Sequence, residues 1–177
     1  MHPFAHLKTI TAHRWRVIAN CFRAGIPMQG LLHDLSKYAP VEFMNGARHY
    51  QGYRSPNDHE REEKGYSAAW LHHKGRNRHH FEYWVDYNAA TRRIEPVPMP
   101  AKYVAEMFCD RLAASKTYNG AAYTDRHPLE YFLKAKGVRM IHPKTSDEIE
   151  GLLRILAEEG EEAAFAAVRR MIKEARS

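Results

Sequence analysis

The chain has 177 residues, 44% of them apolar and 27% charged, a composition that fits one folded domain and excludes an intrinsically disordered chain. No apolar run approaches the roughly 18–20 residues of a membrane span, and the first residues lack the basic start and apolar run of a signal peptide. The two cysteines, Cys21 and Cys109, do not suggest a disulfide framework, so we expect a cytoplasmic protein with no membrane partner.

The net charge of +6 is unevenly distributed along the sequence. Residues 145–177 carry 8 acidic and 5 basic side chains, whereas the other 144 residues carry 13 acidic and 22 basic ones. A basic body favours anionic partners such as phosphate esters, nucleotides or nucleic acid. The basic residues are scattered and form no nucleic-acid-binding module, so a nucleic-acid partner has only this charge in its favour, and a solvated basic surface is the alternative.

Apolar residues recur at helical spacing nearly throughout the chain, starting with 3–24 and a short helix that ends at His33-Asp34. Further on, the pattern predicts helices over 40–48, 58–90 (with an interruption at Gly75 left open), 101–118, 127–136, 146–158 and 161–175. Residues 49–58 are predicted to form a loop, and the prolines of 95–100 exclude regular structure there. Because no segment alternates like a strand, we predict an all-α, single-domain helical bundle.

The bundle is predicted to consist of a main body, 1–144, and a C-terminal helical pair, 145–177, that packs on it. Ser146 is the expected N-cap of that pair, because acidic residues follow it in the first turn, where they suit the helix dipole. The sequence of the pair contains no motif typical of a catalytic or ligand-binding site. We assign it a packing role or a contact between protomers, which leaves a homo-oligomer open.

The most informative motif is the adjacent pair His33-Asp34, within Leu-Leu-His-Asp-Leu-Ser-Lys. An imidazole and a carboxylate offer a nitrogen and an oxygen to one cation, a mixture suited to zinc or a transition metal. Chance can supply such a dipeptide, so other ligands must decide. His13 lies 20 residues upstream on the first helix, with His6 as the reserve candidate, although a lone helical His is more often a satisfied core residue.

Asp110 provides the next candidate ligand. It shares a helix stripe with Met107 and Ala114, which turns its carboxylate toward the interior, where it needs a cation or a dense set of hydrogen bonds. The alternative is an ion pair with Arg16 or Arg76.

Four histidines lie between these ligands, as the pairs His72-His73 and His79-His80. Seven residues are nearly two helical turns, so an unbroken helix would turn His73 and His80 inward and place His72 and His79 on the flanks. If Gly75 or Asn77 ends the helix, either member of each pair could point inward.

Three segments occur in order: a His followed by Arg-Val three and four residues on, then Leu-Leu-His-Asp-Leu-Ser-Lys, then Asp-Arg-Leu-Ala-Ala late in the chain. Together they resemble the HD-domain superfamily of all-α, metal-dependent phosphohydrolases. The resemblance spans residues 13–114 and implies that His13, His33, Asp34 and Asp110 hold one divalent metal. Two departures are the short spacing from His13 to the dyad and Ser36 where a glycine is usual. The histidine-rich run 70–84 is similar to that of a functionally uncharacterised branch.

Some branches of that superfamily use additional histidines for a second metal, and by this resemblance Asp34 would bridge two ions. A single ion with phosphate-binding histidines is the alternative. Imidazole and carboxylate ligands favour Mn, Fe, Co, Ni or Zn over Ca.

The resemblance implies hydrolysis of a small phosphate ester, such as a nucleotide, by metal-activated water. Asp34 and Lys37 are the expected catalytic residues. Lys37, Arg76 and Arg111 would bind the phosphate, and Glu82 and Glu106 would orient ligand histidines. Two other functions stay open: a di-iron oxygenase of the inositol-oxygenase type, and a non-enzymatic basic binding module with a structural metal.

Overall fold

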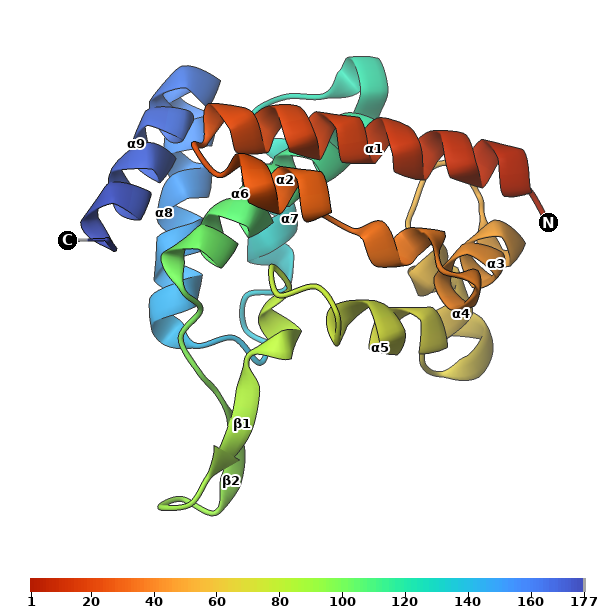
Figure 1. Cartoon of the computed structure of the whole chain (residues 1–177), viewed down its shortest axis with the longest axis horizontal. Coiled ribbons are helices and arrows are strands. Elements are labelled where there is room, and N and C mark those ends of the chain that lie inside the picture. The colour runs from red at the N-terminus through yellow and green to blue at the C-terminus, as the bar shows by residue number, and fades with distance from the viewer. Residues whose placement is uncertain (177) are drawn as a thin grey trace.

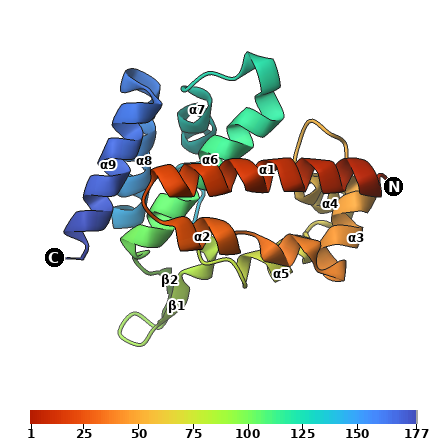
Figure 2. The ribbon, with the colours of Figure 1, turned by 45° about the horizontal axis from the view of Figure 1, so that its top comes forward.

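Two long helices, α1 (Pro3–Arg23) and α6 (Ala101–Asn119), pack against each other through the middle of the protein. The computed structural model describes residues 1–176. Helix α2 (Pro27–Leu32) folds back along α1 after the turn at Gly25, which has a positive φ of 77° (Figures 1 and 2). Proline occupies the first position of α1, α2, α3, α4 and α8, where its missing N–H costs no hydrogen bond.

The other helices surround this pair on two sides. One side holds α3 (Pro40–His49), α4 (Pro56–Lys64) and α5 (Ala68–Lys74), and the other holds α7 (His127–Lys134), α8 (Pro143–Glu159) and α9 (Glu161–Glu174). Three 3-10 turns lie at Leu35–Tyr38, Phe81–Tyr83 and Gly120–Ala122. The mostly helical fold is as predicted. Among residues 1–176, no helix is both long and apolar enough to cross a membrane.

The apolar core is centred on α6 and joins both ends of the chain. Val17 and Cys21 of α1 meet Phe108 and Leu112 of α6, and α8 and α9 close the core from the far side. The Phe108 and Phe165 rings pack edge to face with centroids 5.7 Å apart. The C-terminal pair thus lies on the same core as the body.

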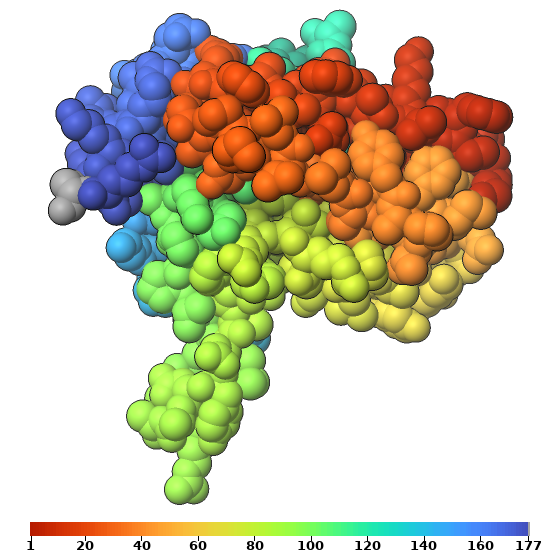
Figure 3. Space-filling view, viewed as in Figure 1, coloured from red at the N-terminus to blue at the C-terminus, as the bar shows by residue number. Residues whose placement is uncertain are grey.

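A β-hairpin interrupts the helices and corrects two predictions. Strands β1 (Val85–Asn88) and β2 (Arg93–Pro96) pair antiparallel, and the hairpin projects from the body (Figures 1 and 3). The helix predicted over 58–90, with its interruption at Gly75 left open, is wrong at its end, where β1 lies, and the absence of regular structure predicted for 95–100 is wrong at its start, where β2 ends. Each strand is only four residues long, too short for alternation to stand out, and Pro96 is tolerated at the end of an edge strand.

Helix boundaries agree with the prediction within a few residues, apart from the segment that carries the histidine pairs. There the predicted helix divides into α4 and α5, because Gly65 ends α4 in the left-handed conformation and α5 stops at Lys74.

The prediction of Ser146 as an N-cap is also wrong. Helix α8 begins at Pro143, and its cap is His142, whose Nδ1 accepts from the Lys144 N–H. Ser146 is instead buried inside the helix.

Gly30 allows α2 to lie directly on α1. A Cβ at this position would be 2.7 Å from the Cys21 Cβ and 3.2 Å from the Ile18 Cα. We expect Gly30→Ala to lower the free energy of unfolding by about 1–3 kcal/mol, because the backbone of α1 cannot yield as a flexible side chain would. Urea denaturation followed by circular dichroism measures this change. Gly151→Ala in α8 is the control: its Cβ meets nothing within 4 Å, so it should stabilise the fold by about 0.5–1 kcal/mol.

Candidate metal centre

The His33-Asp34 dyad lies where α2 ends and the 3-10 turn begins. His33 is the C-cap of α2, and Asp34 adopts a left-handed conformation with φ 54°. Arg14 of α1 holds this corner by donating from its Nε to the His33 carbonyl at 3.1 Å and from Nη2 to the Leu31 carbonyl. Both dyad side chains are buried, at 1% and 2% exposure.

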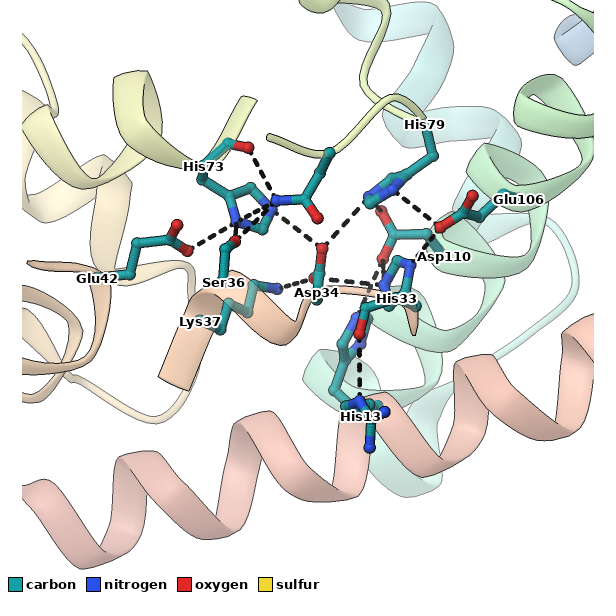
Figure 4. A network of polar contacts seen from close by, with 12 residues as sticks. His13, His33, Asp34, Ser36, Lys37, Glu42, His73, His79, Glu106 and Asp110 are labelled. Atoms are coloured by element: carbon teal, nitrogen blue, oxygen red, sulfur yellow. Dashed lines mark hydrogen bonds and ion pairs between the residues drawn. The ribbon is translucent and has the colours of Figure 1, made fainter. Parts of the chain in front are cut away.

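One group of ligand atoms gathers His13 of α1, the dyad and Asp110 of α6. The His13 Nε2 lies 3.0 Å from the Asp110 Oδ1, and the His33 Nε2 lies 3.3 Å from the Asp34 Oδ2 and 3.7 Å from the Asp110 Oδ1. The alternative ion pair of Asp110 with an arginine does not occur, since Arg16 donates to Thr117 and Arg76 to the His72 carbonyl. His13, His33 and Asp110 bring ligand atoms within 4.8 Å of one another, and Asp34 contacts His33 beside them, so the four residues named by the resemblance lie close together (Figure 4).

A second group lies on the other side of Asp34. The Asp34 Oδ1 is 3.2 Å from the His73 Nε2 and 3.5 Å from the His79 Nε2, and a His80 nitrogen completes a set of four atoms within 4.8 Å of one another. The two oxygens of one carboxylate thus contact different imidazoles: Oδ2 lies near His33, and Oδ1 lies near both His73 and His79 (Figure 4).

The path of the chain after α5 explains which histidines point inward. Gly75 ends the helix, and Asn77 fastens the following turn by donating its backbone N–H and its side-chain amide to the His73 carbonyl. The helix is therefore not unbroken, as one of the two predictions assumed. That prediction is confirmed for His73 and His80, which point inward. It is wrong for His79, which it placed on the flank, because His79 is 1% exposed and faces Asp34.

Two glutamates orient these histidines from behind. The Glu106 Oε1 accepts from the Nδ1 of both His33 and His79, at 2.9 and 3.1 Å. Glu42 of α3 accepts from the His73 Nδ1 at 2.8 Å and from the His72 Nδ1 at 2.6 Å, which turns His72 away from the centre. A proton held at Nδ1 leaves each Nε2 free as a donor atom for a metal. Glu106 was predicted in this position, whereas sequence reasoning missed Glu42; its only signal is its place in the first turn after Pro40.

Burial and charge determine the protonation of the ligands. Burial would raise the pKa of Asp34, but the charges of His33, Lys37 and His73 hold that pKa well below its ordinary value. The pKa of Asp110 is likewise held low, chiefly by His13, against the effect of burial. Burial alone would lower the pKa of His33, yet the surrounding carboxylates raise it to about 10. Burial lowers the pKa of His13 and His80, which favours their neutral, metal-binding form.

The inward atoms of this cluster fit a divalent metal. Six of them are buried and form no hydrogen bond of good geometry within residues 1–176: His13 Nε2, His33 Nε2, Asp34 Oδ1 and Oδ2, His79 Nε2 and His80 Nε2. Several make ion-pair contacts instead, such as His13 Nε2 with Asp110 at 3.0 Å and Asp34 Oδ2 with Lys37 at 2.6 Å. Buried polar atoms are normally hydrogen-bonded, so such a concentration in one place needs an explanation. Imidazole nitrogens and carboxylate oxygens that face one another are the donor set of a transition-metal site.

A cavity of about 610 Å³ borders the ligand cluster and contains some of the predicted substrate-binding residues. Lys37 and Arg111 line it, and the Lys37 Nζ lies 2.6 Å from the Asp34 Oδ2. His6, the reserve ligand, also lines the cavity but is absent from both ligand groups.

Two predicted roles are wrong. Arg76 is exposed, lies outside the cavity and donates to the His72 carbonyl, so it cannot bind a substrate there. Glu82 lines the cavity but accepts from no histidine, so it does not orient a ligand.

Comparison with known proteins gives one family. A family model described as a family of unknown function (DUF5662) matches residues 2–155. No curated protein and no solved structure matches the chain.

Proposed function

The chain belongs to the DUF5662 family, and we propose that it is a metal-dependent phosphohydrolase of HD-domain type that acts on a small phosphate ester. The observation that carries the proposal is the buried Asp34 carboxylate, whose two oxygens contact the Nε2 atoms of three different histidines, His33, His73 and His79. A carboxylate shared by two ligand groups is the arrangement expected of a centre with two ions.

His13, His33 and Asp110 would hold one ion together with the Asp34 Oδ2, which lies 3.3 Å from His33, and Asp34 with His73, His79 and His80 would hold a second. These ligands favour Mn, Fe, Co, Ni or Zn over Ca, which takes oxygen ligands. When bound, such ions polarise a phosphate oxygen and lower the pKa of a coordinated water molecule.

The protein residues supply position and charge. Glu106 and Glu42 fix the imidazole rings by keeping a proton at Nδ1. Lys37 brings a cation to the cavity wall beside Asp34, where it can contact a non-bridging oxygen of a phosphate. His33, Asp34 and His79 are almost fully buried, whereas His13, His73, His80 and Asp110 line the cavity, so the cavity gives access to the centre.

Metal analysis followed by an activity screen tests the proposal. We expect the purified protein, reconstituted with Mn, Fe, Co, Ni or Zn, to retain one or two ions per chain and to release phosphate from at least one nucleotide or sugar phosphate. A metal content near zero that cannot be restored would contradict the proposal. Iron with a mixed-valent signal and oxygen uptake, without phosphate release, would replace it with an oxygenase.

Glu106→Gln is expected to weaken metal binding about 10–100-fold, because the neutral amide oxygen is a weaker acceptor than the charged Oε1 that His33 and His79 share. Isothermal titration of the metal-free variant with Zn²⁺ or Mn²⁺ measures the change. Glu158→Gln, on the exposed face of α8, is the matched control and should bind as the wild type does. Equal affinity of the two variants would show that Glu106 does not orient the ligands.

A further inference from the structure

Arg111 presents a guanidinium without a counterion to the cavity. Its Nε is buried and has no hydrogen-bond partner, and its one polar contact is a long one, from Nη2 to the Met107 Sδ at 3.9 Å. A buried cation normally pairs with a carboxylate, and none of the described carboxylates forms an ion pair with Arg111. This cation therefore lacks the partner that its environment demands.

Other cations on the same cavity wall show the contrast. Lys37 pairs with Asp34 at 2.6 Å, Arg54 with Glu62 at 2.6 Å and Arg61 with Asp58 at 2.7 Å. The absence of a partner for Arg111 is thus a property of its location and not of the whole cavity.

Arg139 brings a second guanidinium to the Phe132 ring, near enough for its charge to act on Arg111. Both arginines lie against the Phe132 ring, with their Cζ atoms 5.4 and 5.1 Å from its centroid. Arg139 donates to the Phe132 and Tyr131 carbonyls and, like Arg111, forms no ion pair with a described carboxylate. Two neighbouring cations repel each other, and an anion between them would remove the repulsion and use the free donors.

The arginine pair, Arg111 and Arg139, occupies a different part of the cavity from the metal ligands. Arg111 follows Asp110 on α6, and consecutive helical residues project about 100° apart, so its side chain runs toward α7 and Phe132 while Asp110 faces His13. Glu82 and Glu130 also line the cavity, and within residues 1–176 neither forms an ion pair with the arginine pair, although the Glu82 charge is near enough to favour the charged form of both guanidinium groups.

We propose that the arginine pair binds an oxyanion, and that the substrate is a phosphate ester with a second phosphate or carboxylate group held there while its reacting phosphate lies at the metal centre. The second statement rests on the proposed function. Planar guanidinium groups match phosphate and carboxylate oxygens in a bidentate manner, which gives specificity as well as charge.

Sulfate binding to the metal-free protein tests the site without any requirement for activity. In two-dimensional NMR spectra we expect a saturable shift of the Arg111 and Arg139 Nε–H signals on addition of sulfate, with the His33 imidazole signals unchanged. Arg111→Gln should weaken binding at least tenfold. Arg111→Lys, which keeps the charge and much of the packing on Phe132, should weaken it less. Arg76→Gln, outside the cavity, is the matched control and should stay within twofold of the wild type.

A non-saturable response, equal sulfate binding by Arg111→Gln and Arg76→Gln, or equal shifts at His33 would overturn the anion site.

Calorimetry with two adenosine ligands tests whether the substrate carries a second anionic group. Adenosine 3′,5′-bisphosphate should bind the metal-loaded protein at least tenfold more tightly than adenosine 5′-monophosphate, and Arg111→Gln should remove that preference. Equal affinities in the wild type would overturn the statement. Failure of the proposed function, in contrast, would appear as absence of metal or of phosphate release while sulfate still bound.

Discussion

Asp34→Asn is expected to reduce metal-dependent phosphate release by about 1000-fold or more while the protein stays folded. The Asp34 carboxylate offers one oxygen to the His33 side and the other to the His73 and His79 side. An amide has one oxygen and no charge, so it can serve only one of these groups. We expect the metal content to fall together with the rate, and metal analysis beside a phosphate-release assay measures both.

Asn is chosen for this substitution because it suits the backbone conformation of residue 34. Asp34 has φ 54°, a left-handed conformation that Asn accepts readily and that strains a residue such as Ala. The variant therefore tests the chemistry without breaking the corner between α2 and the following turn. Asp86→Asn on the exposed hairpin is the matched control and should keep the wild-type rate. A variant at Asp34 that is as active as this control would refute the role of the shared carboxylate.

Removal of the metal should lower the thermal stability by about 5–10 °C. A ligand present at 100 times its dissociation constant stabilises the folded state by about 2.7 kcal/mol, and in a chain of this size each kcal/mol corresponds to about 2–4 °C. The physical reason is that metal binds the assembled donors of α1, the dyad, α5 and α6 and not the unfolded chain. Melting curves before and after chelation, and again after Mn²⁺ or Co²⁺ is restored, measure the shift.

Two variants test whether the change in melting temperature comes from metal bound at this centre or from a general effect of the ion or chelator. The Asp34→Asn protein should show little of the shift, whereas Asp86→Asn should show all of it. A shift below about 1 °C in the wild type, on addition of an ion that elemental analysis shows to be bound, would mean that the centre contributes nothing to the fold.

The sequence was informative about ligands that lie on regular helices. His13 and Asp110 have positions fixed by helical periodicity, so their inward direction could be read from the residues around them. The Glu106 contact follows in the same way, since it lies one turn before Asp110 on the same helix.

The sequence was less informative where tertiary contacts decide the direction of a side chain. His79 points inward because the chain turns after Gly75 and is fastened by Asn77, an irregular path that no periodicity describes. Glu42 reaches His73 only because α3 packs on α5. The unpaired state of Arg111 depends on which carboxylates approach its position in the folded protein, and this cannot be read from the neighbouring sequence. The hairpin was missed because four-residue strands give too short a pattern.

The order in which the ligands occur along the chain has a consequence for biosynthesis. The first donor, His13, is made early, whereas Asp110 lies on α6, which also supplies the apolar surface that covers Val17 and Cys21 of α1. During translation, α1 and α2 must therefore wait, with part of their apolar surface uncovered, until α6 has left the ribosome. The group of Asp34, His73, His79 and His80 is already synthesised by then, whereas the group that includes Asp110 becomes complete only with α6, so the two groups of donors become available one after the other.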